Sequence, residues 1–176
     1  MKNKKIILIA VFAVAAALIY FLSRGSKEEQ PSMGENSAAP QLEISDVMTN
    51  QKIASSSLQG KVVFINIWAS WCEPCREEMP SIDALYREMS ASQDFRMLTI
   101  LYRDSPPTAL EYMKSQGFVF PVYIDPDGLS ARKYGVTGVP ETFIVDKKGM
   151  LVKRVIGGMD WNSQEVKDYL HLLLKP

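Results

Sequence analysis

The chain has 176 residues, of which 47% are apolar and 23% charged, values typical of a globular protein and not of a disordered chain. Its 20 Lys and Arg residues balance 20 Asp and Glu residues, so it lacks the basic surplus of a nucleic-acid-binding protein. Two Cys and one His exclude a disulfide-dense small domain and a four-ligand zinc site. The length allows one domain, or one domain plus an anchor.

The first 23 residues are predicted to be a signal anchor that crosses a membrane. Residues 6–22 carry no charge and follow Lys2, Lys4 and Lys5. A helix of this length spans about 25 Å, near the lower limit for crossing a bilayer. The lysines favour a cytoplasmic N-terminus, so the rest of the chain is expected in the periplasm or on the outer side of the cell membrane. A cleaved signal peptide is the main alternative, and a buried core helix is a weaker one.

Residues 24–39 are rich in Gly, Ser, Glu and Asn, which predicts a flexible linker. Residues 40–176 then form the folded domain. Within residues 40–60, short alternating stretches around Thr49–Gln51 suggest a small β-hairpin with weak strands.

Apolar runs and helical periodicity alternate through the rest of the domain. Residues 61–69 (KVVFINIWA) are a nearly continuous apolar run, as in a strand buried on both faces. The expected strands are residues 61–69, 95–102, 121–124, 141–145 and 150–156. The expected helices follow Cys75, cover 108–116, end at Tyr134, and begin at Asn162 or Ser163. This order predicts an α/β fold whose central mixed sheet of about five strands is flanked by helices.

The motif Cys72-Glu73-Pro74-Cys75 lies where the first buried strand ends and a helix begins. A helix N-terminus carries about half a positive charge and free N–H donors, which stabilise a thiolate. Cys72 is therefore expected to be the exposed nucleophile and Cys75 the shielded resolving thiol. Pro74 stiffens the first turn, where its missing N–H is tolerated. Trp71, Glu73 and Pro74 surround the thiols and are candidates for substrate contact.

Other interpretations of this motif fit less well. A zinc knuckle needs two more ligands, and His171 is alone on the last helix; haem attachment needs His where Arg76 stands. A structural disulfide would close a loop of only four residues, which gains little entropy. Redox chemistry is therefore favoured. His171 and the run Arg76-Glu77-Glu78 are interpreted as solvated surface.

A second segment, Gly138-Val139-Pro140-Glu141-Thr142, precedes the strand at 143–145. Proline entering a central strand removes a ladder donor. A cis Val139–Pro140 bond would explain its place and free the Val139 backbone groups to pair with a substrate strand. An ordinary loop proline is the alternative. Glu141 is expected either to contact the substrate or to be exposed.

Together, Trp71–Cys75 after a buried strand and Gly138–Phe143 about 65 residues later resemble the thioredoxin superfamily. The longer gap, the weak hairpin and the anchor look like its TlpA/ResA branch, which includes CcmG/DsbE proteins. The resemblance covers residues 40–176, including Gly157–Trp161. It implies a thioredoxin-like fold, a cis Pro140 and extracytoplasmic dithiol–disulfide exchange. It further implies apocytochrome c as substrate and a CcdA- or DsbD-type membrane reductase as partner.

The same resemblance implies an acidic residue after the second strand that assists proton transfer near the cysteines. Asp104 falls at this place, where the family usually has Glu. The alternative is an Asp that caps the helix at 106–116.

The expected function is reduction of disulfides in exported proteins by a Cys72/Cys75 dithiol. We expect a monomer that needs no cofactor or metal and binds no nucleic acid. A disulfide oxidase or isomerase would use the same residues and differ in reduction potential. An alternative from another functional class is a non-catalytic, membrane-tethered binding module with a structural disulfide. Thiol reactivity distinguishes it, because the sulfurs of such a module would be unreactive.

Overall fold

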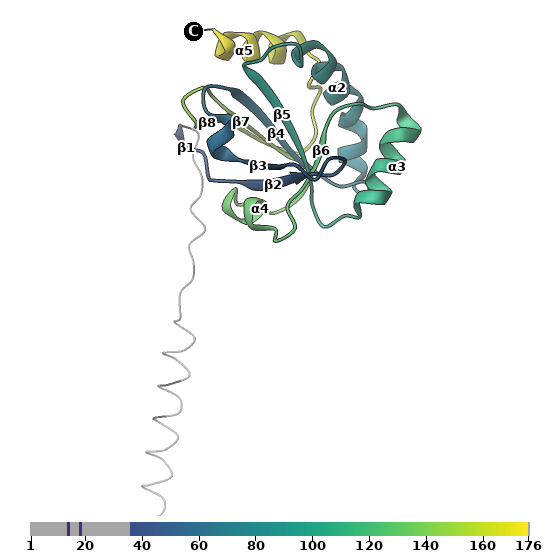
Figure 1. Cartoon of the computed structure of the whole chain (residues 1–176), viewed down its shortest axis with the longest axis vertical. Coiled ribbons are helices and arrows are strands. Elements are labelled where there is room, and N and C mark those ends of the chain that lie inside the picture. Colours follow the sequence, from purple (N-terminus) through teal and green to yellow (C-terminus); the bar gives the residue numbers. More distant parts are fainter. Residues whose placement is uncertain (1–13, 15–17, 19–35, 176) are drawn as a thin grey trace, which may run out of the picture. The chain divides into compact units, whose positions relative to one another are not determined.

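A computed structural model describes residues 14, 18 and 36–175 (Figure 1). Apart from residues 14 and 18 and the end of the linker, the predicted anchor and linker lie outside the described residues. By its contacts the chain forms two units, Met1–Pro31 and Ser32–Pro176, and the second holds the sheet. Among the described residues, none belongs to a helix of the length and apolar character that a membrane crossing requires.

The second unit is built on one mixed sheet of eight strands in the order β1-β8-β7-β4-β5-β6-β2-β3. The strands are β1 (Ser37–Ala38), β2 (Glu43–Asp46), β3 (Lys52–Ala54), β4 (Val62–Trp68), β5 (Phe95–Leu101), β6 (Val122–Ile124), β7 (Glu141–Val145) and β8 (Met150–Ile156). β4, β5 and β6 run parallel, whereas β7 and β8 are antiparallel to their neighbours. These five are the strands that the sequence predicts.

Three short strands enlarge the sheet beyond the five expected. The predicted hairpin, β2 with β3, does not stand apart from the sheet, because β2 pairs antiparallel with β6 and covers that edge. At the other edge, β1 pairs with β8 and lies within the range predicted to be linker. Both additions pair with a strand that would otherwise be a free edge.

Helices cover the two faces of the sheet unequally. α2 (Glu73–Met89), α3 (Pro106–Gln116) and α5 (Gln164–Leu174) contribute side chains to the core on one face. The core on the other face includes side chains from β2, from the 3₁₀ turn η1 (Ser55–Leu58) and from Tyr134, which follows α4 (Leu129–Lys133). Figure 1 shows α2 and α3 on the side of the sheet away from α4.

All seven residues of the central strand β4 are buried, and its alternation assigns them to the two cores. Val62, Phe64 and Trp68 pack with α2, α3 and α5, while Val63, Ile65 and Ile67 pack on the opposite face. By the same alternation Asn66 lies on the face of the sheet that packs with α2, α3 and α5, and it is fully buried. The central strand therefore presents one polar side chain to the helix that follows it.

Candidate active site

Cys72 and Cys75 lie at the junction between β4 and α2. Cys72 is the N-cap residue of α2, and its Sγ accepts a hydrogen bond from the Cys75 backbone N–H at 3.3 Å. The two residues form a disulfide with a Cα–Cα distance of 5.3 Å. Cys72 is buried, with 5% exposed, and not exposed as expected, while Cys75 is fully buried; only the relative order of accessibility matches the prediction. The sulfur that an incoming substrate reaches first is therefore that of Cys72.

The second predicted segment lies directly against Cys72. The Val139–Pro140 peptide bond is cis, as predicted, and the Val139 carbonyl oxygen lies 3.5 Å from the Cys72 sulfur. On the helix side of the disulfide, Glu73 and Pro74 are exposed. Trp71 is 61% exposed, and its indole N–H donates to the Arg103 carbonyl at 3.2 Å. The structure thus gathers five of the six predicted substrate-contact residues around the disulfide.

Glu141 is placed differently from both expectations. Its side chain is fully buried, so it does not reach solvent and presents no surface to a substrate in this structure. One carboxylate oxygen accepts hydrogen bonds from Arg154, at 2.8 and 3.1 Å, and the other accepts the Thr137 N–H at 3.1 Å. Glu141 therefore fastens β7 to β8 and to the chain that leads into Pro140.

Asp104 is not the cap of α3, and it makes backbone contacts that the sequence did not predict. Its Oδ2 accepts the Ser70 backbone N–H at 2.6 Å, and its Oδ1 accepts that of Ser105 at 2.7 Å. The N-cap residue of α3 is Ser105, not Asp104. Among residues 36–175, no hydrogen bond joins Asp104 to a cysteine, and its part in proton transfer stays a prediction. Asp104 positions the backbone two residues before Cys72.

Glu78 is the site residue that sequence reasoning missed. It was expected on a solvated helix face, but only 3% of it is exposed. Its Oε1 accepts from the Asn66 amide at 2.9 Å, and its Oε2 accepts from the Trp161 indole N–H at 2.8 Å and the Met159 backbone N–H at 3.3 Å. Burial raises the pKa of Glu78 above its ordinary value of 4.5, and these three hydrogen bonds oppose the rise.

Two sequence signals point to Glu78. Asn66 is a polar residue inside an otherwise apolar strand, and it requires a hydrogen-bonding partner once buried. Glu78 stands one helical turn after Cys75 and next to Met79, in the phase of the buried face of α2. Its carboxylate is consequently a buried acid one turn from the shielded thiol.

The segment Gly157–Trp161 closes this side of the site. A Cβ atom at Gly158 would lie 3.1 Å from the Pro74 carbonyl oxygen and 3.6 Å from Glu78 Oε2, so this position allows close approach to the active-site helix. An open hollow of about 390 Å³ lies between the segment and α2. Glu77, Glu78 and Asp160 are its acidic lining residues.

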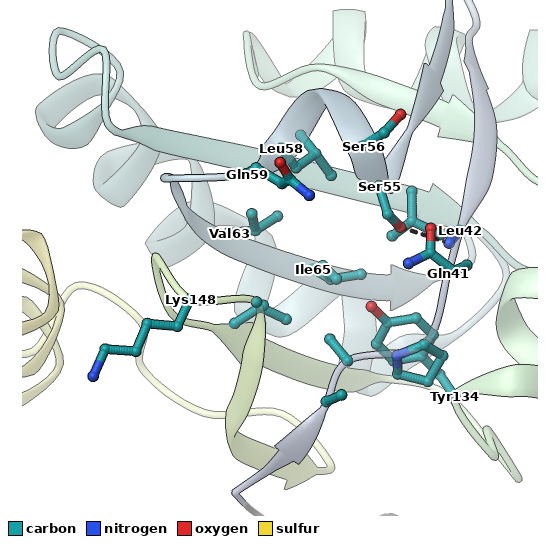
Figure 2. Close-up of a pocket in the computed structure, with 15 residues that line it drawn as sticks. Gln41, Leu42, Ser55, Ser56, Leu58, Gln59, Val63, Ile65, Tyr134 and Lys148 are labelled. Carbon is teal, nitrogen blue, oxygen red and sulfur yellow. Dashed lines mark hydrogen bonds between the residues drawn. The ribbon is translucent and has the colours of Figure 1, made fainter.

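A separate cavity of about 270 Å³ lies on the opposite face of the sheet, over Val63 and Ile65 (Figure 2). Its lining has hydroxyl groups, as on Ser55 and Tyr134, and the amide of Gln41, but no Cys, His, Asp or Glu. Across residues 36–175, moreover, no cluster of three such side chains could hold a metal ion. The groups suited to redox and proton transfer are therefore those around Cys72.

Comparison with known proteins defines the class. Residues 34–173 match the Redoxin family. The chain is 32% identical to the thiol-disulfide oxidoreductase ResA of Bacillus subtilis (strain 168), over 98% of this chain and 96% of that protein. It is 31% identical to the thiol:disulfide interchange protein DsbE of Allochromatium vinosum, over 90% and 86% of the two chains.

A solved structure agrees with this class. A thiol:disulfide interchange protein of the thioredoxin family from Chlorobium tepidum TLS superimposes with a TM-score of 0.66 at 26% identity. The match covers 82% of this chain and all of the other. The fold is thus thioredoxin-like, and the redox-active pair of a thiol-disulfide oxidoreductase is Cys72 with Cys75. Within that class, this chain belongs to the Redoxin family, where ResA and DsbE proteins are among its relatives.

Proposed function

We propose that the domain works as a reductant outside the cytoplasm and that it reduces disulfides of exported proteins, with the haem-binding cysteines of apocytochrome c as its substrate class. The observation that carries the proposal is the Cys72–Cys75 disulfide at the N-terminus of α2, with the Val139 carbonyl 3.5 Å from Cys72. The similarity to ResA and DsbE over most of the chain supports thiol-disulfide exchange, and the resemblance of the two motifs to the TlpA/ResA branch suggests the substrate class. The charge-flanked apolar run at residues 6–22 supports the location.

The reaction begins with the reduced dithiol. The Cys72 thiolate attacks one sulfur of the substrate disulfide, the substrate bond breaks, and its other sulfur leaves as a thiolate. The substrate is then joined to Cys72. Backbone groups next to Val139 lie beside this bond and are available to hold an extended substrate segment.

In the second step the Cys75 thiol loses its proton and its sulfur attacks Cys72. The substrate is released with both cysteines reduced, and the two electrons of the dithiol have passed to it. Glu78 is the proton acceptor for this step, because side chains one turn apart on a helix have Cβ atoms about 5–6 Å apart and both groups are buried. The domain is left as the disulfide that the structure contains.

The disulfide must then be reduced again from outside the domain. A membrane thiol reductase of the CcdA or DsbD type is the partner we propose, and an N-terminal anchor would raise the local concentration of the domain near it. Within this chain, the two steps use the sulfurs of Cys72 and Cys75 and the carboxylate of Glu78.

The experiment that tests the function is capture of the substrate by Cys75→Ser in cells. Without the resolving thiol, the bond between Cys72 and the substrate should persist and be recovered under non-reducing conditions. The control is the double variant Cys72→Ser/Cys75→Ser, which should capture nothing. Haem-free cytochrome c among the adducts would support the substrate class; adducts of other exported proteins only would replace it. Absence of every Cys72-dependent adduct would refute the reductase assignment.

The direction of electron flow is tested separately with purified full-length protein in detergent. Equilibration with glutathione redox buffers gives the reduction potential of the Cys72–Cys75 pair. A potential near that of thioredoxin, about −270 mV, fits a reductant, whereas about −120 mV would identify a disulfide oxidase.

A further inference from the structure

We propose that Trp161 is a positioning residue for the redox reaction: its indole N–H orients the Glu78 carboxylate and sets how readily this carboxylate takes the Cys75 proton. The proposal rests on the function assigned to Glu78 above. Trp161 lies 83 positions after Glu78 in the sequence. Among residues 36–175, no hydrogen bond joins Trp161 to either cysteine.

The contact is built for a defined geometry. Trp161 is 1% exposed, and its Nε1–H donates to Glu78 Oε2 at 2.8 Å. Its ring packs edge-on against Phe64 of β4, with centroids 4.9 Å apart and planes at 88°. Its backbone N–H donates to the Ser81 hydroxyl at 3.0 Å, one turn further along α2. The indole is thus fixed on three sides and cannot follow Glu78 if the carboxylate turns away.

The groups around Glu78 explain why one indole N–H has this influence. From β4 comes the Asn66 amide, which also donates to Thr142 of β7, and from the 157–161 segment comes the Met159 N–H. Every hydrogen bond that the described residues make to this carboxylate has a neutral donor. The charged groups that share its hollow, Glu77 and Asp160, are themselves acids.

Across residues 36–175, the ionised form of Glu78 is therefore supported by hydrogen bonds and not by a cation. Hydrogen bonds to a charged acceptor are stronger than those between neutral groups, so losing one of three donors has a large effect on proton affinity. The lost donor favours the protonated acid, and the pKa of Glu78 should rise.

The chain supplies a matched control for this idea. Trp68 is also fully buried and belongs to the same core, but its indole nitrogen has no hydrogen-bond partner among the described residues. Trp161→Phe and Trp68→Phe remove the same atoms from the same kind of environment. They differ in whether a hydrogen bond to Glu78 is lost.

The experiment follows two pH titrations in the full-length protein in detergent. Carbon-13 NMR of the Glu78 carboxyl in the oxidised protein reports its proton affinity. Stopped-flow release of the second thionitrobenzoate after mixing reduced protein with Ellman's reagent reports the Cys75 step. In Trp161→Phe both profiles should move up by about one pH unit, a tenfold change in proton affinity, whereas Trp68→Phe should superimpose on the unsubstituted protein.

Each outcome decides the proposal. Equal shifts in the two variants would mean a general packing effect, and no shift in Trp161→Phe would mean that the indole does not control Glu78; either result overturns the proposal. If the thiols of the unsubstituted protein are inert, the proposed function fails, but the carboxyl titration still tests the contact. Should Trp161→Phe not fold, the indole N–H resonances of the unsubstituted protein suffice: that of Trp161 must follow the Glu78 titration and that of Trp68 must not.

Discussion

Replacing Glu78 by Gln should change the pH dependence of stability in a direction that the structure fixes. Burial raises the pKa of Glu78 in the folded protein above its ordinary value of 4.5. At pH values between 4.5 and the raised pKa, the folded state binds more protons than the unfolded state. The free energy of unfolding therefore falls as the pH rises from 4.5 to the raised pKa. The loss is complete above the folded pKa. Gln does not ionise, so Glu78→Gln escapes this loss.

The magnitude follows from linkage. Each unit by which the folded pKa exceeds the ordinary value removes about 1.4 kcal/mol of stability at neutral pH. Gln has nearly the shape of Glu, and its oxygen can keep the donors from Trp161 and Met159. Its amide then faces Asn66, whose Oδ1 is buried without a partner among the described residues and can accept from it after a turn of the Asn66 amide.

The assay is urea unfolding of the oxidised full-length protein in detergent, followed by circular dichroism from pH 4.5 to 8. The stability of Glu78→Gln relative to the unsubstituted protein should increase with pH and then become constant. Glu77→Gln, on the exposed face of the same helix, controls for the loss of one negative charge. A difference for Glu78→Gln that is constant, or that decreases with pH, would refute the reasoning about burial.

Two further substitutions test the contacts that hold the site. Arg154→Ala leaves Glu141 fully buried without its cation and should lower the free energy of unfolding, measured with urea, by about 3–5 kcal/mol. As a control, Glu88→Ala removes one partner of a half-exposed ion pair and should lower it by about 0–1 kcal/mol. Equal losses in the two variants would contradict the structural role of the Arg154–Glu141 pair. Asp104→Ala removes the acceptor for the Ser70 N–H, whereas Asp104→Asn keeps an acceptor. Alkylation of Cys72 should therefore be slower in Asp104→Ala than in Asp104→Asn. Identical rates would exclude a role of Asp104 in positioning the backbone before Cys72.

The main strands were predictable because burial on both faces leaves a clear pattern. Continuous β-branched and apolar runs identify β4 and β5, and Gly117 ends α3 with a left-handed conformation, φ 72°, where the sequence expects it. The extra strands were not predictable in this way. β1 has two residues, Ser37 and Ala38, and pairs with β8 through backbone groups that any sequence offers.

The thiol motif and the proline segment were predictable because their chemistry is local. Cys72 and Cys75 are three residues apart, and the helix N-terminus next to them follows from the end of β4. Asp104 shows where local reasoning ends, since an acidic residue before a helix suggests a cap, yet its acceptor is used by Ser70, 34 residues earlier.

The two buried glutamates were misplaced for one physical reason. Charged residues are rarely buried, so a sequence pattern assigns them to the surface unless a partner is known. The partner of Glu141 is Arg154, across the β7–β8 pair, and the donor to Glu78 from Trp161 is 83 residues away. Such partners become evident only when the chain is folded.

The partners of the two buried glutamates indicate a structural role for Glu141 and a chemical role for Glu78. Glu141 is paired with a guanidinium, so its charge is compensated and its burial is a matter of architecture. Within the part of the chain that the structure describes, Glu78 has only neutral donors, and at neutral pH its burial weakens the fold. A glutamine at that position could accept from the Trp161 and Met159 donors without this penalty, because it carries no charge. A destabilising acid one helical turn from Cys75 is therefore better explained by proton transfer at the disulfide than by packing.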